Sequence, residues 1–175
     1  MNKHIAVTGS SKKIGKAIHE AFPNAVACGR DRGGDITTIE GRTTILHQAM
    51  ACDVFINNAH DGFGQVDMLN TMFKAWQHKE NKHIINIGVD TVPYTDWQVV
   101  HKKYPIEKMA LHAQAELLQN EERKCKITTL ALGYVDTEFN KDYNGPKLSY
   151  KNIIDTIKWI IDNEAEIKFM VLSAK

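Results

Sequence analysis

Short apolar runs alternate with amphipathic segments along almost the whole chain, and this alternation constrains the fold more than any other feature of the sequence. The apolar runs predict strands at 4–7, 25–28, 53–56, 83–87, 126–132 and 167–172. Apolar residues at helical spacing predict helices at 14–22, 39–50, 68–77, 104–120 and 150–163, with Gly41 an unfavourable residue inside the second helix.

Short strands that are apolar on both faces are typical of a parallel sheet covered by helices on each side. We therefore predict a Rossmann-type, doubly wound α/β fold of three layers, α/β/α, with residues 1–175 forming one domain. Ligands on such sheets bind beyond the carboxyl ends of the strands. The predicted site is thus built from the loops that follow Val7, Cys28, Ile56, Ile87 and Leu132.

Charge and cysteine content exclude several classes of function. The net charge is +1 and 25% of residues are charged, so no basic excess points to a nucleic-acid or membrane-surface partner. No apolar run approaches the roughly 20 residues of a membrane helix, and a strand starting at His4 leaves no room for a signal peptide. Three dispersed cysteines predict neither a disulfide framework nor a metal site, so we expect a reduced, cytoplasmic setting.

The segment between the first strand and the first helix reads Thr8-Gly9-Ser10-Ser11-Lys12-Lys13-Ile14-Gly15. Small residues let the backbone approach a diphosphate, and the helix N-terminus adds N–H donors and a partial positive charge. The segment predicts a dinucleotide-binding loop. The alternative is an ordinary tight turn.

This loop resembles the T-G-x-x-x-G-x-G motif of the short-chain dehydrogenase/reductase family, with Lys13 in place of the middle glycine. Similar motifs follow in the family's order: Asp35-Ile36, Asn57-Asn58-Ala59-His60 for N-N-A-G, Asn86-Ile87, Tyr104-Pro105-Ile106-Glu107-Lys108 for Y-x-x-x-K, and Gly133-Tyr134-Val135-Asp136-Thr137, with Leu132 for the usual proline. The resemblance implies a nicotinamide cofactor held by Gly9, Ser10, Ser11, Lys12, Lys13, Ile14, Gly15, Arg30, Asp35, Ile36, Asn58, Ala59, Lys108, Gly133, Val135 and Thr137. It implies that the Asp35 carboxylate accepts a bond from the adenine amino group.

Tyr104 and Lys108 stand four residues apart in a predicted helix, so their side chains share one face. An ammonium beside a phenol favours the phenolate and lowers the tyrosine pKa from about 10. Such a tyrosine can give or take the alcohol proton while a hydride moves to or from the nicotinamide. The alternative is an exposed helix with a solvated lysine.

The family's catalytic serine and asparagine have no clear equivalents. Counting forward from Asn86 puts the serine position at Val89, whereas counting back from Tyr104 puts it at Thr91. Thr91 carries the required hydroxyl and is our candidate, while Val89 would leave the site without that donor. Asn70 is the nearest match to the asparagine, and its alternative is a solvent-facing helix residue.

The choice of cofactor follows from charge at the end of the second strand. An acid there binds the ribose hydroxyls of NAD, and a base receives the 2′-phosphate of NADP. The acidic position falls on Gly29, with Arg30 next to it and Lys12 in the glycine loop. Two cations and no carboxylate predict NADP(H) in preference to NAD(H), unless a shift of one residue brings Asp31 into the position.

Two functional hypotheses follow. The first is an NADP(H)-dependent reductase or dehydrogenase acting on a small carbonyl/alcohol substrate. The second is a non-catalytic dinucleotide-binding protein, which Lys13, His60, Val89 and Leu132 favour. The short segment 138–148 predicts a small lid, and so either an open substrate pocket or a bulky or macromolecule-borne substrate. The resemblance implies a homodimer or homotetramer through helices 68–77 and 104–120. The histidines, His60, His101 and His112 among them, show no metal-ligand spacing, so no metal is expected.

Overall fold

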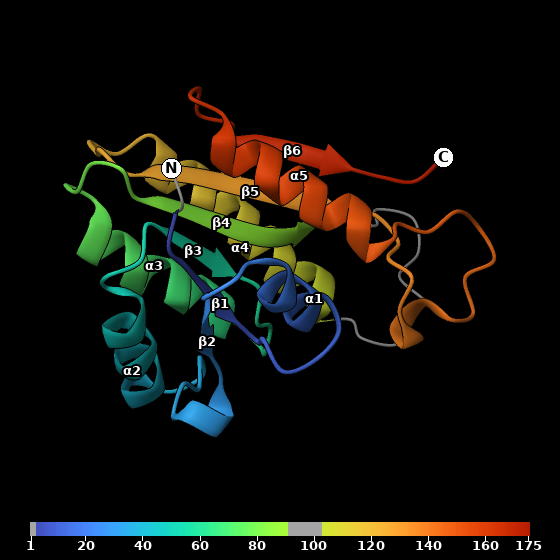
Figure 1. Cartoon of the computed structure of the whole chain (residues 1–175), viewed down its shortest axis with the longest axis horizontal. Helices are drawn as coiled ribbons and strands as arrows, with labels where there is room; N and C mark the ends of the chain where they lie inside the picture. The colour runs from blue at the N-terminus through green and yellow to red at the C-terminus, as the bar shows by residue number, and fades with distance from the viewer. Residues whose placement is uncertain (1–2, 91–102) are drawn as a thin grey trace.

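A computed structural model describes residues 3–90 and 103–175 of the chain and shows one six-stranded, all-parallel sheet (Figure 1). The strand order is β2-β1-β3-β4-β5-β6. The strands are β1 (Ile5–Thr8), β2 (Val26–Cys28), β3 (Val54–Asn57), β4 (His83–Val89), β5 (Lys126–Leu132) and β6 (Phe169–Leu172). The helices are α1 (Lys13–Ala21), α2 (Ile39–Ala49), α3 (Gly64–Trp76), α4 (Tyr104–Gln119) and α5 (Tyr150–Asp162). The predicted doubly wound α/β fold is confirmed.

Two apolar layers bury the sheet between the helices. One layer joins alternate strand residues such as Phe55 and Ile84 to α2, α3 and α4. The other joins the intervening residues, such as Ile56 and Ile85, to α1 and α5. Figure 1 shows α1 and α5 in front of the sheet and α4 behind it. Because neighbouring strand residues point to opposite faces, strands apolar at every position are what this arrangement requires.

The element boundaries differ from the predicted ones by a few residues, and the largest difference is at the start of α3. The helix begins at Gly64 rather than at Met68. The added turn places Gln65, which is buried, in the first turn of the helix. This turn proves to be part of the candidate site.

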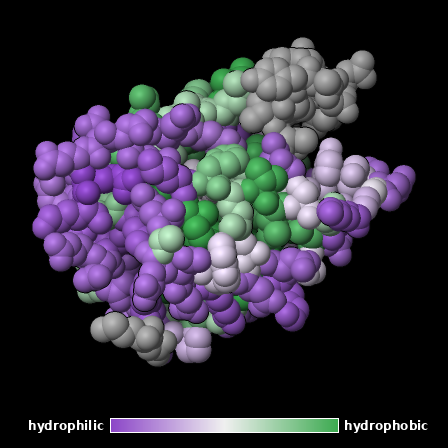
Figure 2. All heavy atoms as spheres, turned by 90° about the horizontal axis from the view of Figure 1, so that it is seen from above, coloured by the Kyte–Doolittle hydropathy of each residue, from purple (hydrophilic) through white to green (hydrophobic). Residues whose placement is uncertain are grey.

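The outermost strand, β6, carries exposed apolar side chains, Phe169 and Val171. Figure 2 looks onto the molecule from this side and shows hydrophobic side chains gathered on an otherwise largely hydrophilic face. No helix in the described part of the chain is long and apolar enough to cross a membrane.

Candidate active site

Parallel pairing brings the ends of β1, β3, β4 and β5 to one edge of the sheet, and the predicted site residues cluster at the loops that leave this edge. The buried Thr8 side chain connects two of the loops. Its hydroxyl oxygen accepts hydrogen bonds from the backbone N–H groups of Asn58 and Ala59, each at 2.9 Å. The Asn58 amide donates in return to the Thr8 carbonyl oxygen at 3.0 Å. The glycine loop and the loop after β3 are thus one braced unit.

The glycine loop has the backbone shape that its spacing of small residues predicts. Gly9 has φ 68°, and Lys13 has φ 49°, both in the left-handed region that glycine adopts without cost. A Cβ at Gly15 would lie 2.1 Å from the Gly9 carbonyl oxygen, so only glycine fits there. The first turn of α1 has no side-chain cap, which leaves its N–H groups directed at this edge. This is the geometry that holds a diphosphate.

The expected adenosine end holds an ion-pair cluster. Arg30 Nε donates to Asp35 Oδ2 at 2.9 Å, and Arg30 Nη2 donates to Asp61. Hydrogen bonds from Thr37 and from Arg30 lower the pKa of the Asp35 carboxyl group below its usual range. The expectation of two cations and no carboxylate was therefore wrong, because the loops that follow β2 and β3 bring both acids to Arg30.

The position at the end of β2 is also more acidic than predicted. A Cβ at Gly29 would lie 2.7 Å from an Asp31 carboxylate oxygen, so this side chain folds back over the end of the strand. Asp31 is exposed and lies 3.9 Å from Arg32. Charges of both signs therefore surround this end of the site.

Tyr104 and Lys108 lie in the first turns of α4, at the end of β4. Lys108 is buried, and its ammonium donates to Gln65 Oε1 at 2.7 Å and to the Ile87 carbonyl oxygen at 2.9 Å. Burial lowers the pKa of Lys108 from 10.5 to about 7. Its nitrogen lies over the Tyr104 ring, 5.6 Å from the ring centroid.

The expected lowering of the Tyr104 pKa is not seen. Burial raises the pKa of the phenol above 10 instead. The desolvation of the phenol is the cause. Lys108 does not offset it, because burial lowers the pKa of Lys108 to about 7 and so leaves the amine uncharged in the pH range where a tyrosine titrates. The alternative of a solvated lysine is wrong as well, because only 3% of Lys108 is exposed.

Gln65 is a site residue that the sequence interpretation missed. Its amide nitrogen donates to the carbonyl oxygens of Asn57, at 2.6 Å, and Ile87, at 3.1 Å. The side-chain amide of Asn57 donates in turn to the backbone carbonyl oxygen of Gln65 and to Asn86 Oδ1. Gln65 precedes Met68 by three residues on the buried side of α3, so a polar residue on that apolar stripe was the available signal.

Asn70 lies outside this network. Its side-chain oxygen accepts a hydrogen bond from Gln114 at 2.9 Å, at the contact of α3 with α4. The structure thus gives no support to Asn70 as the fourth catalytic residue, and Gln65 is the α3 side chain that reaches Lys108.

Of the two candidates for the serine position, Val89 is the last residue of β4 and pairs with Leu132. Its side chain offers no hydroxyl. Thr91 lies outside the described residues, so its role stays a prediction.

The expected nicotinamide segment begins directly at the end of β5. The Gly133 N–H donates to the Leu172 carbonyl oxygen at 2.8 Å, and a Cβ on Gly133 would lie 2.9 Å from Ser173 Oγ. Val135 is buried, and Thr137 precedes a short 3-10 helix, η2 (Glu138–Asn140). Leu132, which replaces the usual proline, continues β5 and pairs with β6.

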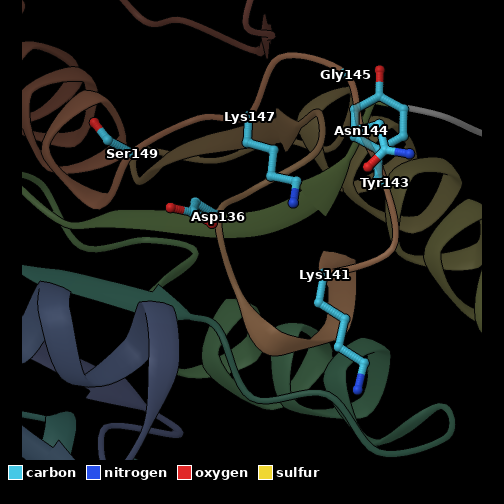
Figure 3. A pocket seen from close by; sticks show the side chains of 7 residues that line it. All are labelled: Asp136, Lys141, Tyr143, Asn144, Gly145, Lys147 and Ser149. Carbon is cyan, nitrogen blue, oxygen red and sulfur yellow. The ribbon is translucent and has the colours of Figure 1, made fainter.

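The segment between β5 and α5 forms an open depression of about 410 Å³ (Figure 3). Lys147 extends its amine into the hollow, with Asp136 on one side and Asn144 on the other. Lys141 lies at the far end and is 3.2 Å from Glu138. The short segment 138–148 thus borders a hollow that is open to solvent, and its relation to a substrate pocket stays a prediction.

No cluster of histidine, cysteine or acidic residues in the described part of the chain is arranged to hold a metal ion. The cysteines, Cys28, Cys52 and Cys125, are buried and free. Burial raises the pKa of Cys28 to about 12 and that of Cys125 to about 11, so these thiols are held in their unreactive form.

The fold and the arrangement of this edge define a Rossmann-type α/β protein. No protein-family model matches the sequence. No curated protein sequence matches it either.

Solved structures resembling this chain are short-chain dehydrogenases/reductases. A short-chain dehydrogenase from Burkholderia cenocepacia, in complex with NADP, has a TM-score of 0.74 at 18% identity, over 96% of this chain and 87% of that one. The 3-alpha-hydroxysteroid dehydrogenase from Pseudomonas sp., complexed with NADH, has a TM-score of 0.75 at 16% identity, over 97% and 95%. L-sorbose reductase from Gluconobacter frateurii, complexed with NADPH and L-sorbose, has a TM-score of 0.75 at 16% identity. The match covers 98% of this chain and 95% of that one. The fold is therefore the fold of that family.

Proposed function

We propose that the chain is a divergent short-chain dehydrogenase/reductase that uses NADP(H) to interconvert a carbonyl and an alcohol. The observation that carries the proposal is the position of Tyr104 and Lys108. Both lie in the first turns of α4, and the Lys108 ammonium donates to the Ile87 carbonyl oxygen near the end of β4. This strand end lies at the same edge of the sheet as the glycine loop. The structural neighbours include enzymes complexed with NADP, NADH and NADPH.

The residues present fit a nicotinamide dinucleotide. The uncapped first turn of α1 and the left-handed Gly9 would hold its diphosphate. An ammonium has three donors, and Lys108 uses two of them on Gln65 and Ile87, which leaves one for a ribose hydroxyl. The bound cofactor supplies the hydride, and Tyr104 supplies or takes the proton of the alcohol.

A cofactor also corrects the electrostatics of the pair. The negative charge of bound phosphates would favour the protonated ammonium of Lys108 and so oppose the lowering of its pKa by burial. A fully charged Lys108 over the Tyr104 ring then favours the phenolate. We therefore expect the Tyr104 pKa to fall when the cofactor binds, although burial raises it in the free protein.

NADP(H) is our choice because Arg30 and Arg32 follow β2 at the expected adenosine end and Lys12 belongs to the neighbouring glycine loop. A 2′-phosphate would replace one of the two carboxylates that now pair with Arg30. The test compares Arg30→Ala with the unaltered protein in binding NADPH and NADH. We expect a loss of at least tenfold for NADPH only, whereas equal losses for both would contradict the phosphate contact.

Turnover is tested by oxidation of NADPH over a panel of aldehydes and ketones. We expect activity that Tyr104→Phe reduces by at least a hundredfold without changing NADPH binding. Binding without turnover, unaffected by Tyr104→Phe, would support the second hypothesis, a non-catalytic dinucleotide-binding protein. Val89 at the end of β4 and the raised pKa of Tyr104 are the observations that favour that hypothesis.

We further propose that the protein forms a homodimer or homotetramer. Ile106, Met109 and Leu117 are exposed on α4 at helical spacing, so they form one apolar stripe on its outer side. Light scattering tests this: Leu117→Glu is expected to give monomers, and a monomeric unaltered protein would contradict the proposal.

A further inference from the structure

His60 lies in the candidate site, although the sequence predicts no function for it. It follows the Asn57-Asn58-Ala59 segment in the loop after β3. Its imidazole packs edge-on against the ring of Tyr104, with the ring centroids 4.8 Å apart and the planes at 72°. A glycine, which the resembling motif has here, would leave this side of the phenol uncovered.

Glu107 holds the imidazole in place. His60 Nε2 lies 2.9 Å from Glu107 Oε2. The two side chains are only 26% and 11% exposed, so water screens the contact less than it screens a surface pair. A carboxylate accepts hydrogen bonds, which assigns the proton to Nε2 and leaves Nδ1 as the acceptor of the neutral ring.

Burial and the charged groups around His60 act on its pKa in opposite directions. Burial first and Lys108 second lower the pKa of His60, whereas Glu107 and Asp61 raise it. The result is a pKa below 6.5, at which the ring is mainly neutral at pH 7. Tyr104, which packs on the ring, titrates above 10 and adds no charge near neutral pH.

Lys108, by contrast, is poorly placed to exchange protons with water. It is buried and bonded to Gln65 and to the Ile87 carbonyl oxygen. Tyr104 must nevertheless recover a proton after each carbonyl reduction. His60 is partly exposed and its ring packs against that of Tyr104, which brings the imidazole close enough for a water molecule to connect it to the phenol.

We propose that His60, oriented by Glu107, is the proton relay that connects Tyr104 to solvent, an inference that rests on the proposed function. In reduction, Tyr104 would pass its phenol proton to the carbonyl oxygen, while bound NADPH would supply the hydride to the carbonyl carbon. The resulting phenolate takes a proton from the protonated fraction of His60, which is the minor form at pH 7 and shrinks further as the pH rises. The neutral imidazole then takes a proton from water, so the sum is carbonyl, NADPH and one proton giving alcohol and NADP⁺.

The kinetic test is the pH profile of NADPH-dependent reduction by His60→Gln, a variant that keeps a donor to Glu107. We expect kcat to fall at least tenfold and to lose the decline that the unaltered protein shows as pH rises through the pKa of His60. NADPH binding should stay within twofold. His47→Gln, on the exposed side of α2, is the control and should keep the profile.

Chemical rescue separates a relay from a packing role. Added imidazole should restore at least a tenth of the activity to His60→Gly, because a small base can enter the space left by the side chain. No rescue, together with an unchanged pH profile in His60→Gln, would overturn the inference while leaving the proposed function intact.

A readout on the free protein needs no turnover. In ¹⁵N spectra, assigned by the loss of a signal in His60→Gln, Tyr104→Phe should shift the Nδ1 resonance of His60 because it removes the hydroxyl and keeps the ring. His47 should not move. An unmoved His60 signal would overturn the inference even if the protein proved inactive.

Discussion

Lys13 replaces the middle glycine of the T-G-x-x-x-G-x-G motif but keeps a backbone conformation that suits glycine. Its backbone has φ 49°, the left-handed conformation for which a glycine is suited. The loop therefore follows the path expected of T-G-x-x-x-G-x-G with a lysine in place of its middle glycine. Left-handed backbone costs a residue with a Cβ about 1–2 kcal/mol.

Lys13→Gly should consequently stabilise the protein. We expect the free energy of unfolding to rise by roughly 0.5–1 kcal/mol, since the greater freedom of glycine in the unfolded chain offsets part of the gain. Urea unfolding measures it. Lys12→Gly, at an extended position of the same loop, is the control and should lower stability. A loss of stability in Lys13→Gly would contradict the assigned backbone strain.

The buried Lys108 should make stability depend on pH. Its pKa is about 7 in the folded chain, against 10.5 for an ordinary lysine, so between these values the unfolded state binds a proton that the folded state does not. The free energy of unfolding should therefore rise with pH in this window, by at most about 1.4 kcal/mol per pH unit. Below pH 7 the cost of burying the charged lysine is fully present.

Urea unfolding at pH 7 and pH 9 measures this effect. Lys108→Met should remove the additional gain that the unaltered protein shows at the higher pH. Parallel changes in the two proteins would mean that Lys108 is not desolvated as the structure has it.

At the scale of elements, strand and helix positions followed from apolar periodicity alone, whereas contacts between elements did not. The carboxylates at Arg30 come from loops after different strands, and the hydrogen bond from Gln65 to Lys108 joins α3 to α4. Such pairs depend on side-chain directions and on loop paths, which periodicity does not encode. The start of α3 was missed for a related reason, since Phe63-Gly64 carries no capping side chain.

Gly41 is an unfavourable residue for a helix, and the close contact of α2 with the Asp35-Ile36 loop explains its presence. It lies inside α2, where alanine would normally be about 1 kcal/mol better. A Cβ there would lie 2.1 Å from the Asp35 carbonyl oxygen, so the helix can approach the Asp35-Ile36 loop only without a side chain.

Gly41→Ala should thus destabilise the protein, whereas the same substitution inside a helix is usually stabilising. We expect a loss of at least about 1 kcal/mol in the free energy of unfolding, because backbone must move to relieve the overlap. Thr43→Ala, exposed on the same helix, should change stability little. Thermal unfolding of the two variants distinguishes them, and a stabilised Gly41→Ala would contradict the close approach.

For the molecule as a whole, the sequence explains the fold well and the candidate site less completely. Alternating apolar strands and amphipathic helices dictate a parallel sheet with two buried faces, and the structure has them. The direction of the Tyr104 pKa could not be predicted, because it depends on how deeply α4 buries the phenol and on what else binds Lys108. Local spacing places the two residues together but does not set their solvation.

We propose above all that the glycine loop after β1 binds a nicotinamide dinucleotide. Calorimetric titration of the free protein with NADPH measures this binding. We predict saturable binding of one NADPH per chain at sub-millimolar concentration, weakened at least tenfold in Arg30→Ala. An absence of binding heat at millimolar NADPH, with the protein folded, would contradict the account.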